Sequence, residues 1–213
     1  DAYSLVYHCH PPTAVNSIDT PYSVAPEIAD GKNMQHRLLR GFDIRAAEDY
    51  LESRIPVLVN NDCCIHLAAP RSSMSDYWIK NSGADEMIFI HRGTGVLRTI
   101  YGRIPFSYGD HLIIPRGTIY QMEFHSNDNR LFILESFHPL RFPKRYINKF
   151  GQLLEHSPFC ERDIRKPIDL ETHDEKGDFL VKIKREDTIW PYNFATHPFD
   201  LVGWDGYHYP YAV

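Results

Sequence analysis

The stretch Gly109-Asp110-His111-Leu112-Ile113-Ile114-Pro115-Arg116-Gly117-Thr118-Ile119-Tyr120 is the part of the sequence that decides the fold. It places two short apolar runs, His111–Ile114 and Ile119–Phe124, on either side of a Pro-Arg-Gly turn. Glycine tolerates the positive φ that tight turns need, and proline fixes its own φ near −65°. We therefore expect a strand-turn-strand unit here.

The same pattern of short runs extends from about residue 55 to residue 137, with turns rich in Gly, Asn and Asp between them. Such spacing favours an antiparallel sandwich or jelly-roll barrel, because parallel strands need long helical crossovers that are missing here. The predicted fold class is mainly β. The expected strands are Val57–Val59, Cys64–Ala68, Glu86–His91, Val96–Tyr101, His111–Ile114, Ile119–Phe124 and Arg130–Ser136.

The rest of the chain is less regular. Residues 144–155 carry apolar residues at helical spacing and predict a short helix, although Gly151 interrupts them. A long irregular connection over 156–176 and strands at 179–184 and 199–204 are expected to follow. We divide the chain into an N-terminal arm lying on the barrel (1–54), the barrel (55–140), and a helix and connecting region (141–213).

Composition removes several classes of protein. The 213 residues are 43% hydrophobic and 24% charged, which is typical of globular proteins and excludes disorder. Four scattered cysteines form neither a disulfide framework nor a zinc motif, which favours the reducing cytoplasm. The apolar runs are shorter than the roughly 18 residues that a membrane span needs. A net charge of −5 without a basic cluster argues against a nucleic-acid partner.

The ends of the chain suggest a piece of a longer polypeptide. The first residue is Asp1 rather than methionine, and residues 207–213 have a strand-like composition with no polar tail after them. We therefore expect the natural protein to continue past Val213.

Two short motifs could carry chemistry near the start of the chain and of the barrel. His8 and His10 are two residues apart, so on a strand they would face one way and could share a metal ion. Pro11 and Pro12 follow them directly and no carboxylate is near in sequence, which weighs against that role. Cys63 and Cys64 would point to opposite faces of a strand and are interpreted as structural thiols.

The remaining polar motifs are interpreted as structural. Asp85 and Glu86 would diverge on a strand, so we expect one to be solvated and the other to bond a turn. The loops 154–163 and 171–178 mix His, Cys, acids and bases, and such loops are usually held by internal hydrogen bonds or a neighbouring subunit. Arg92-Gly93-Thr94-Gly95 is expected to be a hairpin turn, and residues 203–207 a turn with packing side chains.

The stretch 109–120 resembles the second cupin motif, in which Gly, Pro and Gly shape the unit that presents a metal-binding His. Tyr120 stands at the position of that His. Glu86 and Gly93 match the first cupin motif, but its ligand positions fall among residues 79–82 (Ile-Lys-Asn-Ser), without a His. A site with two His and one carboxylate needs both imidazoles. The resemblance therefore implies a degenerate, metal-free cupin-like barrel; a jelly roll with good turns explains the spacing equally well.

Longer matches identify a family. Residues 57–63, 85–95 and 109–120 resemble the amino-terminal barrel of bacterial-type homogentisate 1,2-dioxygenases. Residues 150–163, 171–179 and 196–206 and the early Tyr7-His8 with Pro11-Pro12-Thr13 are similar to the same family, and 150–180 is its most specific block.

The resemblance implies a pair of cupin-like barrels assembled as trimers or hexamers, and a reaction in which O2 opens the ring of homogentisate at Fe(II) to give maleylacetoacetate in tyrosine and phenylalanine breakdown. The family's iron ligands and its base lie in the second barrel, so no catalytic, cofactor-binding or metal-ligating residue is assigned in this chain. Two other interpretations stay open: a non-enzymatic binding or assembly domain, and a metalloenzyme that uses His8, His10 and a distant carboxylate.

Overall fold

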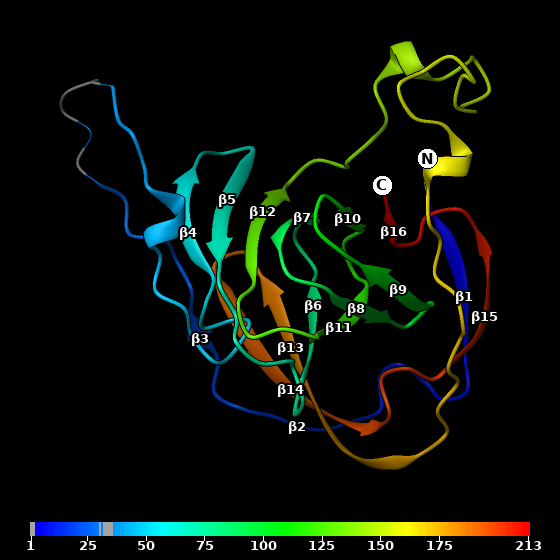
Figure 1. The fold of residues 1–213 in the computed structure, drawn as a ribbon. Helices are drawn as coiled ribbons and strands as arrows, with labels where there is room; N and C mark the ends of the chain where they lie inside the picture. The colour runs from blue at the N-terminus through cyan, green and yellow to red at the C-terminus, as the bar shows by residue number, and fades with distance from the viewer. Residues whose placement is uncertain (1–2, 30, 32–35) are drawn as a thin grey trace.

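The computed structural model describes residues 3–29, 31 and 36–213 and is built from packed β-sheets (Figure 1). The first sheet has six strands, in the spatial order β16 (Tyr211–Ala212), β10 (His111–Ile114), β7 (Asp85–Arg92), β12 (Arg130–Ser136), β5 (Cys63–Ala68) and β4 (Ile55–Val59). The second has the order β2 (Val15–Ile18), β14 (Thr188–Thr196), β13 (Lys176–Arg185), β6 (Trp78–Asn81), β11 (Ile119–Phe124), β8 (Gly95–Thr99) and β9 (Gly102–Phe106), and β3 (Tyr22–Ser23) also pairs with β14.

A third, two-stranded sheet joins β1 (Ser4–His8) to β15 (Leu201–Gly206). The named strand pairs are antiparallel except β13 with β6, which run parallel. That exception is possible because a long stretch of chain, from Ser82 to Glu175, lies between the two strands.

The core lies between the two larger sheets. Alternate residues of β7 and β12, such as Ile88, Ile90 and Ile133, are buried and face residues of the second sheet. Leu97, Tyr120 and Met122 belong to the same cluster. A second cluster, around Val181, Phe199 and Leu201, fills the opposite side of β13. The mainly β fold class predicted from the sequence is confirmed.

The expected strands between residues 55 and 137 form within two residues of their predicted limits. The strand expected at 179–184 is longer, and the one at 199–204 begins at Leu201. Pattern alone missed β6, β9 and β14, together with the three strands of the arm, whereas β16 lies within residues 207–213, whose composition is strand-like. Residues 1–54 are therefore not merely an arm lying on the barrel, because β1, β2 and β3 pair with β15 and β14. Residues 1, 2, 30 and 32–35 of the arm lie outside the described residues.

The predicted helix over 144–155 is wrong. Only a single 3-10 turn forms, at Lys144–Tyr146. The Asn148 side-chain oxygen accepts the backbone N–H groups of Phe150 and Gln152, and Gly151 adopts a φ of +85°. These local bonds give the backbone an alternative to helix, as Asn side chains often do. The connection over 156–176 is irregular as expected, with one 3-10 turn at Glu161–Asp163.

Two predicted turns have other roles. Arg92–Gly95 is not a hairpin turn, because β7 pairs with β10 and β12 whereas β8 pairs with β9 and β11, so the segment carries the chain from one sheet to the other. Gly93 has a φ of +109°, and a Cβ there would overlap Asn129. Residues 203–206 continue β15 rather than turning, and Trp204 packs edge-on against Tyr101.

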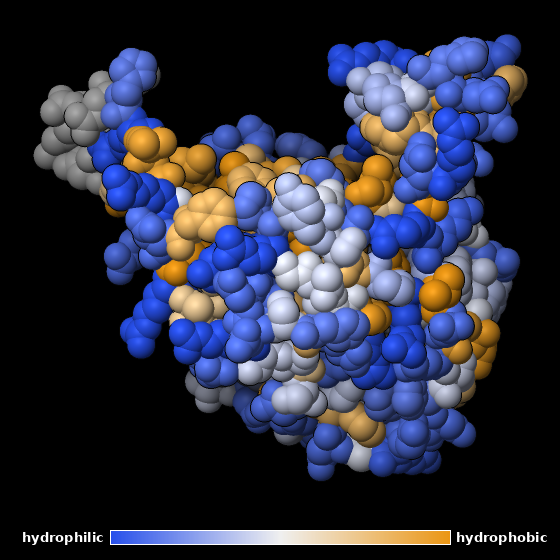
Figure 2. Space-filling model, in the orientation of Figure 1, coloured by the Kyte–Doolittle hydropathy of each residue, from blue (hydrophilic) through white to orange (hydrophobic). Residues whose placement is uncertain are grey.

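The outer face of the six-stranded sheet carries an apolar groove of about 640 Å³. Leu38, Leu39 and Phe42 of the arm form one side, and Leu67 and Phe89 form the floor. Figure 2 shows hydrophobic residues gathered along this upper side of the molecule, between two protruding segments. Among the described residues, no helix is long and apolar enough to cross a membrane.

Candidate functional site

One end of the barrel interior is polar. On β7 and β12 the buried residues are apolar along most of the strand and become polar at one end. There Glu86 of β7, Glu135 of β12 and His66 of β5 are buried, and Lys182 and Lys184 extend from β13. This arrangement follows from the period-two alternation of strands, which keeps residues i and i+2 on one face. We call this group, together with Arg54 and Tyr120, the polar cluster.

Arg54, from the segment before β4, is the centre of the polar cluster. Its Nη1 donates to Glu86 Oε1 at 2.8 Å and its Nη2 to Glu135 Oε1 at 2.6 Å. The Arg54 side chain is 6% exposed, and the two carboxylates are 1% and 0% exposed. A guanidinium suits this position, because its fixed fork of donors can serve two carboxylates at once.

The remaining carboxylate oxygens also have donors. Tyr120 Oη donates to Glu86 Oε2 at 2.8 Å, and Lys184 Nζ donates to Glu135 Oε2 at 2.6 Å. Asn81 Nδ2 adds a bond to Glu135 Oε1. Each oxygen of the two buried carboxylates is thus satisfied, which is what burial of a charge requires.

The electrostatics of the cluster follow from burial and pairing. Burial by itself raises the pKa of Glu135, but Arg54 and Lys184 outweigh it and hold that pKa below its usual value. Burial, reinforced by the charge of Glu86, raises the pKa of Tyr120 well above its usual value, so its hydroxyl stays a donor. Burial lowers the pKa of His66 to about 3, so this imidazole is neutral at physiological pH.

The two cupin-motif positions predicted from the sequence, Glu86 and Tyr120, do meet. They meet around a guanidinium rather than around a set of metal donors, because Arg54 already pairs with both carboxylates. In the described part of the chain, no group of three or more His, Cys, Asp or Glu side chains could hold a metal ion. The donor set of this barrel therefore does not fit Fe(II).

The interpretation of Asp85 and Glu86 needs correction. Neither is solvated: Asp85 is 2% and Glu86 0% exposed. Asp85 does bond a turn, since its Oδ1 accepts from the backbone N–H and Nε of Arg116, and its Oδ2 accepts from Leu140. Asp85 is covered by the chain after the barrel, and Glu86 is reached by Arg54. The strand pattern does not reveal either contact.

The structure brings the early His8-Cys9-His10 motif to two later loops. Asp200 contacts His8 Nδ1 at 2.6 Å and accepts the backbone N–H of His10, while His10 Nε2 lies 2.6 Å from Asp174. Each imidazole therefore has its own carboxylate. These pairs attach the end of β1 to the loop 171–178 and to the start of β15.

The two polar loops have internal partners, as predicted. In 171–178, Glu171 pairs with Arg98, and the His173 ring stacks on His197 at 3.9 Å. Burial and the neighbouring His173 lower the pKa of His197 to about 4. In 154–163, the Ser157 hydroxyl and the Asp163 carboxylate bond backbone groups of the same loop.

The paired cysteines behave as structural thiols. Cys63 is half-buried and Cys64 is buried, and both are free. Cys64 Sγ lies 3.5 Å from His66 Nε2. Burial raises the pKa of the Cys64 thiol, which disfavours the reactive thiolate.

Sequence reasoning missed most of the polar cluster. Glu135 continues the alternation of Leu131 and Ile133 on β12, so the pattern could have marked it as a buried carboxylate. No strand alternation marks Arg54, because it lies in an irregular segment and meets its partners only in the folded structure.

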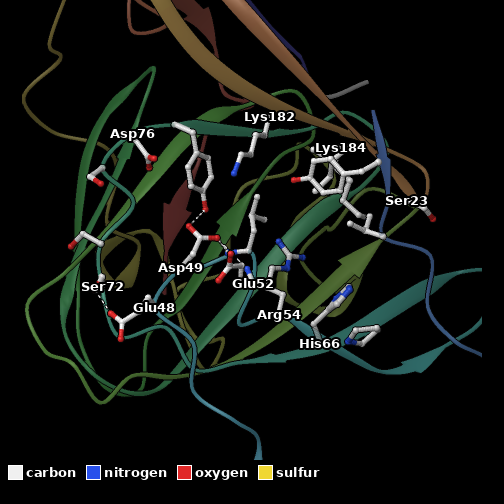
Figure 3. A pocket seen from close by; sticks show the side chains of 18 residues that line it. Ser23, Glu48, Asp49, Glu52, Arg54, His66, Ser72, Asp76, Lys182 and Lys184 are labelled. Carbon is white, nitrogen blue, oxygen red and sulfur yellow. Dashed lines mark hydrogen bonds between the residues drawn. The ribbon is translucent and has the colours of Figure 1, made fainter. Parts of the chain in front are cut away.

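A cavity of about 680 Å³ opens beside the cluster (Figure 3). Arg54, His66, Lys182 and Lys184 form one part of its wall. Strand β3 and the segment before β4 form other parts, so the N-terminal arm completes the cavity. Glu48, Asp49, Glu52 and Asp76 line it as well, so the cavity presents charges of both signs to a small molecule.

The comparisons with known proteins include a family match over most of the chain. The model of the family described as "Homogentisate 1,2-dioxygenase N-terminal" matches residues 49–213. A protein of Saccharolobus solfataricus named "Putative dioxygenase SSO1533" is 34% identical over 212 residues, which is 99% of this chain and 54% of that protein. The chain thus spans about half the length of this curated relative.

Solved structures of cupin-type proteins also align, at low similarity. A cupin-2 domain protein of Shewanella frigidimarina is 19% identical with a TM-score of 0.35, and covers 39% of this chain and 79% of its own. KdgF from Halomonas sp. is 15% identical with a TM-score of 0.37, over 40% of this chain and 80% of its own.

Proposed function

Because this chain belongs to the homogentisate 1,2-dioxygenase N-terminal family, we propose that it is the non-ligating amino-terminal part of an Fe(II)-dependent aromatic ring-cleaving dioxygenase. The proposed reaction is homogentisate plus O2 to maleylacetoacetate, a step of tyrosine and phenylalanine breakdown in the cytoplasm. The family match over residues 49–213 is the observation that carries the proposal, and the name of the Saccharolobus relative supports an oxygenase class.

The polar cluster supports the non-ligating role. Arg54 occupies the space between Glu86 and Glu135, and Tyr120 replaces the imidazole of the second cupin motif. In the proposal, iron bound by the remainder of the protein supplies the activation of O2. The residues of this half contribute a rigid barrel, held by buried ion pairs, on which that remainder is positioned.

The apolar groove over β5 and β7 supports the proposed assembly into trimers or hexamers. Leu38 is 90% exposed and Leu39 is 56% exposed in this chain. Exposed apolar surface of this kind commonly marks a protein contact. In the assembled enzyme, the groove would be covered by another part of the protein or by a neighbouring subunit.

Oxygen uptake tests the proposal. The 213-residue chain and a longer form that extends past Val213 are each loaded with Fe(II) and given homogentisate, with gentisate as the comparison substrate. We expect homogentisate-dependent uptake by the longer form alone, and none after residues 1–213 are deleted from it. Uptake by the short chain, or turnover without residues 1–213, would contradict the non-ligating role of this half. A preference for gentisate would show that homogentisate is not the substrate.

A binding role for this half is the second candidate function. The cavity beside Arg54 favours it, because cationic side chains line a space large enough for a small molecule.

A further inference from the structure

The outer face of the six-stranded sheet is apolar from one edge to the other. Along each strand, alternate residues point into the barrel core and the residues between them point outward. An antiparallel sheet with one face in solvent normally carries polar residues on that face. The outward residues of this sheet include Leu67, Phe89 and Phe132, so its outer face has the composition of a core.

The strand register places these outward residues in two rows that cross the sheet, which we call the apolar rows. The pairing of neighbouring strands defines one row as Ile55, Leu67, Phe132, Phe89 and His111, and the other as Leu58, Ile65, Leu134, Met87, Ile113 and Tyr211. All members but His111 are hydrophobic residues. The second row reaches all six strands, which at about 4.8 Å between strands is a length of about 24 Å.

The apolar rows are accessible in this chain. Leu58 is 57% and Ile55 is 38% exposed, and the other hydrophobic members of the rows are half-buried. Phe42 of the arm lines the groove at one end of the rows, and at the other end the Phe142 ring lies 5.6 Å from the Tyr211 ring. Figure 2 shows hydrophobic residues gathered between the two protruding segments. A contiguous apolar surface of this kind marks an interaction site.

The size of this surface indicates a folded partner. A length of about 24 Å corresponds to about six strands of a second sheet or to a helix of about sixteen residues. Sheets pack face to face through rows of this kind, with the side chains of both faces interdigitating. A small molecule would leave most of both rows in water.

The last strand of the chain favours one occupant. Tyr211 of β16 ends the second row, and the backbone of Val213 exchanges two hydrogen bonds with His111 of β10. Figure 1 shows β16 and the C-terminus beside β10. Polypeptide that follows Val213 therefore begins at one end of the apolar rows. The Saccharolobus relative has the length for such a continuation, because this chain covers 54% of it.

We propose that the apolar rows are the docking face for the part of the protein that follows Val213, which covers both rows with an apolar face of its own. The inference rests on the proposed function, because it takes this chain as the amino-terminal part of a longer protein. It adds the surface through which the two parts are joined, and it selects the same polypeptide rather than a neighbouring subunit as the cover.

Methionine oxidation measures the cover directly. Met87 lies in the second row and is half-buried, whereas Met74 is 3% and Met122 is 0% exposed. The 213-residue chain and the longer form are treated with hydrogen peroxide in the presence of a chelator, and peptide mass spectrometry follows each methionine. An accessible thioether is oxidised to the sulfoxide, and a covered one reacts only after local opening.

The rate of Met87 oxidation should depend on the length of the protein. We expect Met87 to react at least about tenfold more slowly in the longer form than in the 213-residue chain. Met74 and Met122 should react slowly in both forms, since the barrel core covers them in either case. Equal rates for Met87 in the two forms would overturn the proposal.

Dilution distinguishes the same polypeptide from a second copy. A cover within one polypeptide protects Met87 at every protein concentration, whereas a contact between copies weakens on dilution. We expect the protection in the longer form to stay constant over a series of dilutions. Loss of that protection on dilution would overturn the proposal in favour of a neighbouring subunit, as would protection that appears in the short chain when it is concentrated.

Two leucine variants test the contact itself. Leu58 lies in the second row and Leu5 lies on β1, outside the rows, and in this chain they are 57% and 56% exposed. In the longer form, Leu58→Asn should raise the rate of Met87 oxidation at least about threefold, because an amide buried without a partner weakens the contact. Leu5→Asn should leave that rate unchanged, and circular dichroism verifies that both variants fold. An equal rate in the two variants would contradict the docking face.

Oxygen uptake by the same longer form separates this inference from the proposed function. Protection of Met87 without homogentisate-dependent uptake would support the docking face and contradict the proposed activity. Uptake by a longer form in which Met87 is as reactive as in the short chain would refute the docking face and leave the proposed activity in place.

Discussion

Removing the Arg54 guanidinium should destabilise the barrel strongly. Arg54→Met keeps much of the side-chain volume but leaves Glu86 and Glu135, which are 0% exposed, without their shared cation. Breaking a buried ion pair by removing one partner typically costs about 3–5 kcal/mol. The loss falls mainly on Glu86, which keeps only the Tyr120 hydroxyl as a partner, because Glu135 retains Lys184. We expect the free energy of unfolding to fall by an amount in that range.

Equilibrium urea unfolding measures the loss, with the fluorescence of Trp78, Trp190 and Trp204 as the signal. Arg92→Met is the matched control, because the Arg92–Asp128 pair has a similar length of 2.7 Å but both side chains are about half exposed. Exposed ion pairs contribute little to stability, so this variant should unfold close to the parent protein.

A double variant separates charge from packing. Adding Glu86→Gln to Arg54→Met removes the carboxylate charge that is left without a cation and should recover part of the loss. Two results would refute the reasoning: a loss in Arg54→Met no larger than in Arg92→Met, or no recovery in the double variant.

Two further variants test the turn at Gly93 and the buried imidazole. Gly93→Ala should lower the free energy of urea unfolding by about 2–3 kcal/mol, because the φ of +109° is strained for alanine and its Cβ would overlap Asn129. The control Gly109→Ala, at a φ of +94° with nothing within 4 Å, should lower it by only about 1 kcal/mol. Equal losses in the two variants would contradict the close approach of Asn129 to Gly93. Burial lowers the pKa of His66 to about 3 from 6.5, so the unfolded chain binds the extra proton between these values and the free energy of unfolding falls as the pH falls through that window. His66→Gln should remove up to about 1.4 kcal/mol per pH unit of that slope, measured by urea unfolding at several pH values, and an unchanged slope would show that His66 is not the group responsible.

The strands around the quoted stretch could be predicted because their signal is local. Alternation of side chains along β12, and the turn formed by Pro115 and Gly117, depend on residues next to one another in the chain. The same reasoning failed for residues 144–155, where the apolar spacing was helical but Asn148 and Gly151 stabilised a tight loop. Short edge strands such as β3 and β16 have too few residues for any period, and they form because a neighbouring strand offers them hydrogen bonds.

Only part of the candidate site could be predicted from the sequence. The motif comparison selected Glu86 and Tyr120, and the structure places them in contact. It could not supply Arg54, Glu135 or Lys184, which come from segments far apart in the chain.

By itself, the sequence determined the mainly β class, the family and the loss of the second-motif His, because each depends on residue identity at fixed local spacing. Only the tertiary structure decided which groups meet around Glu86 and Tyr120. Arg54 reaches two carboxylates because a buried negative charge must be paired, and folding selects the arrangement in which every such charge has a partner. The same folding turned part of the N-terminal arm into strands, one of which lines the cavity beside Arg54.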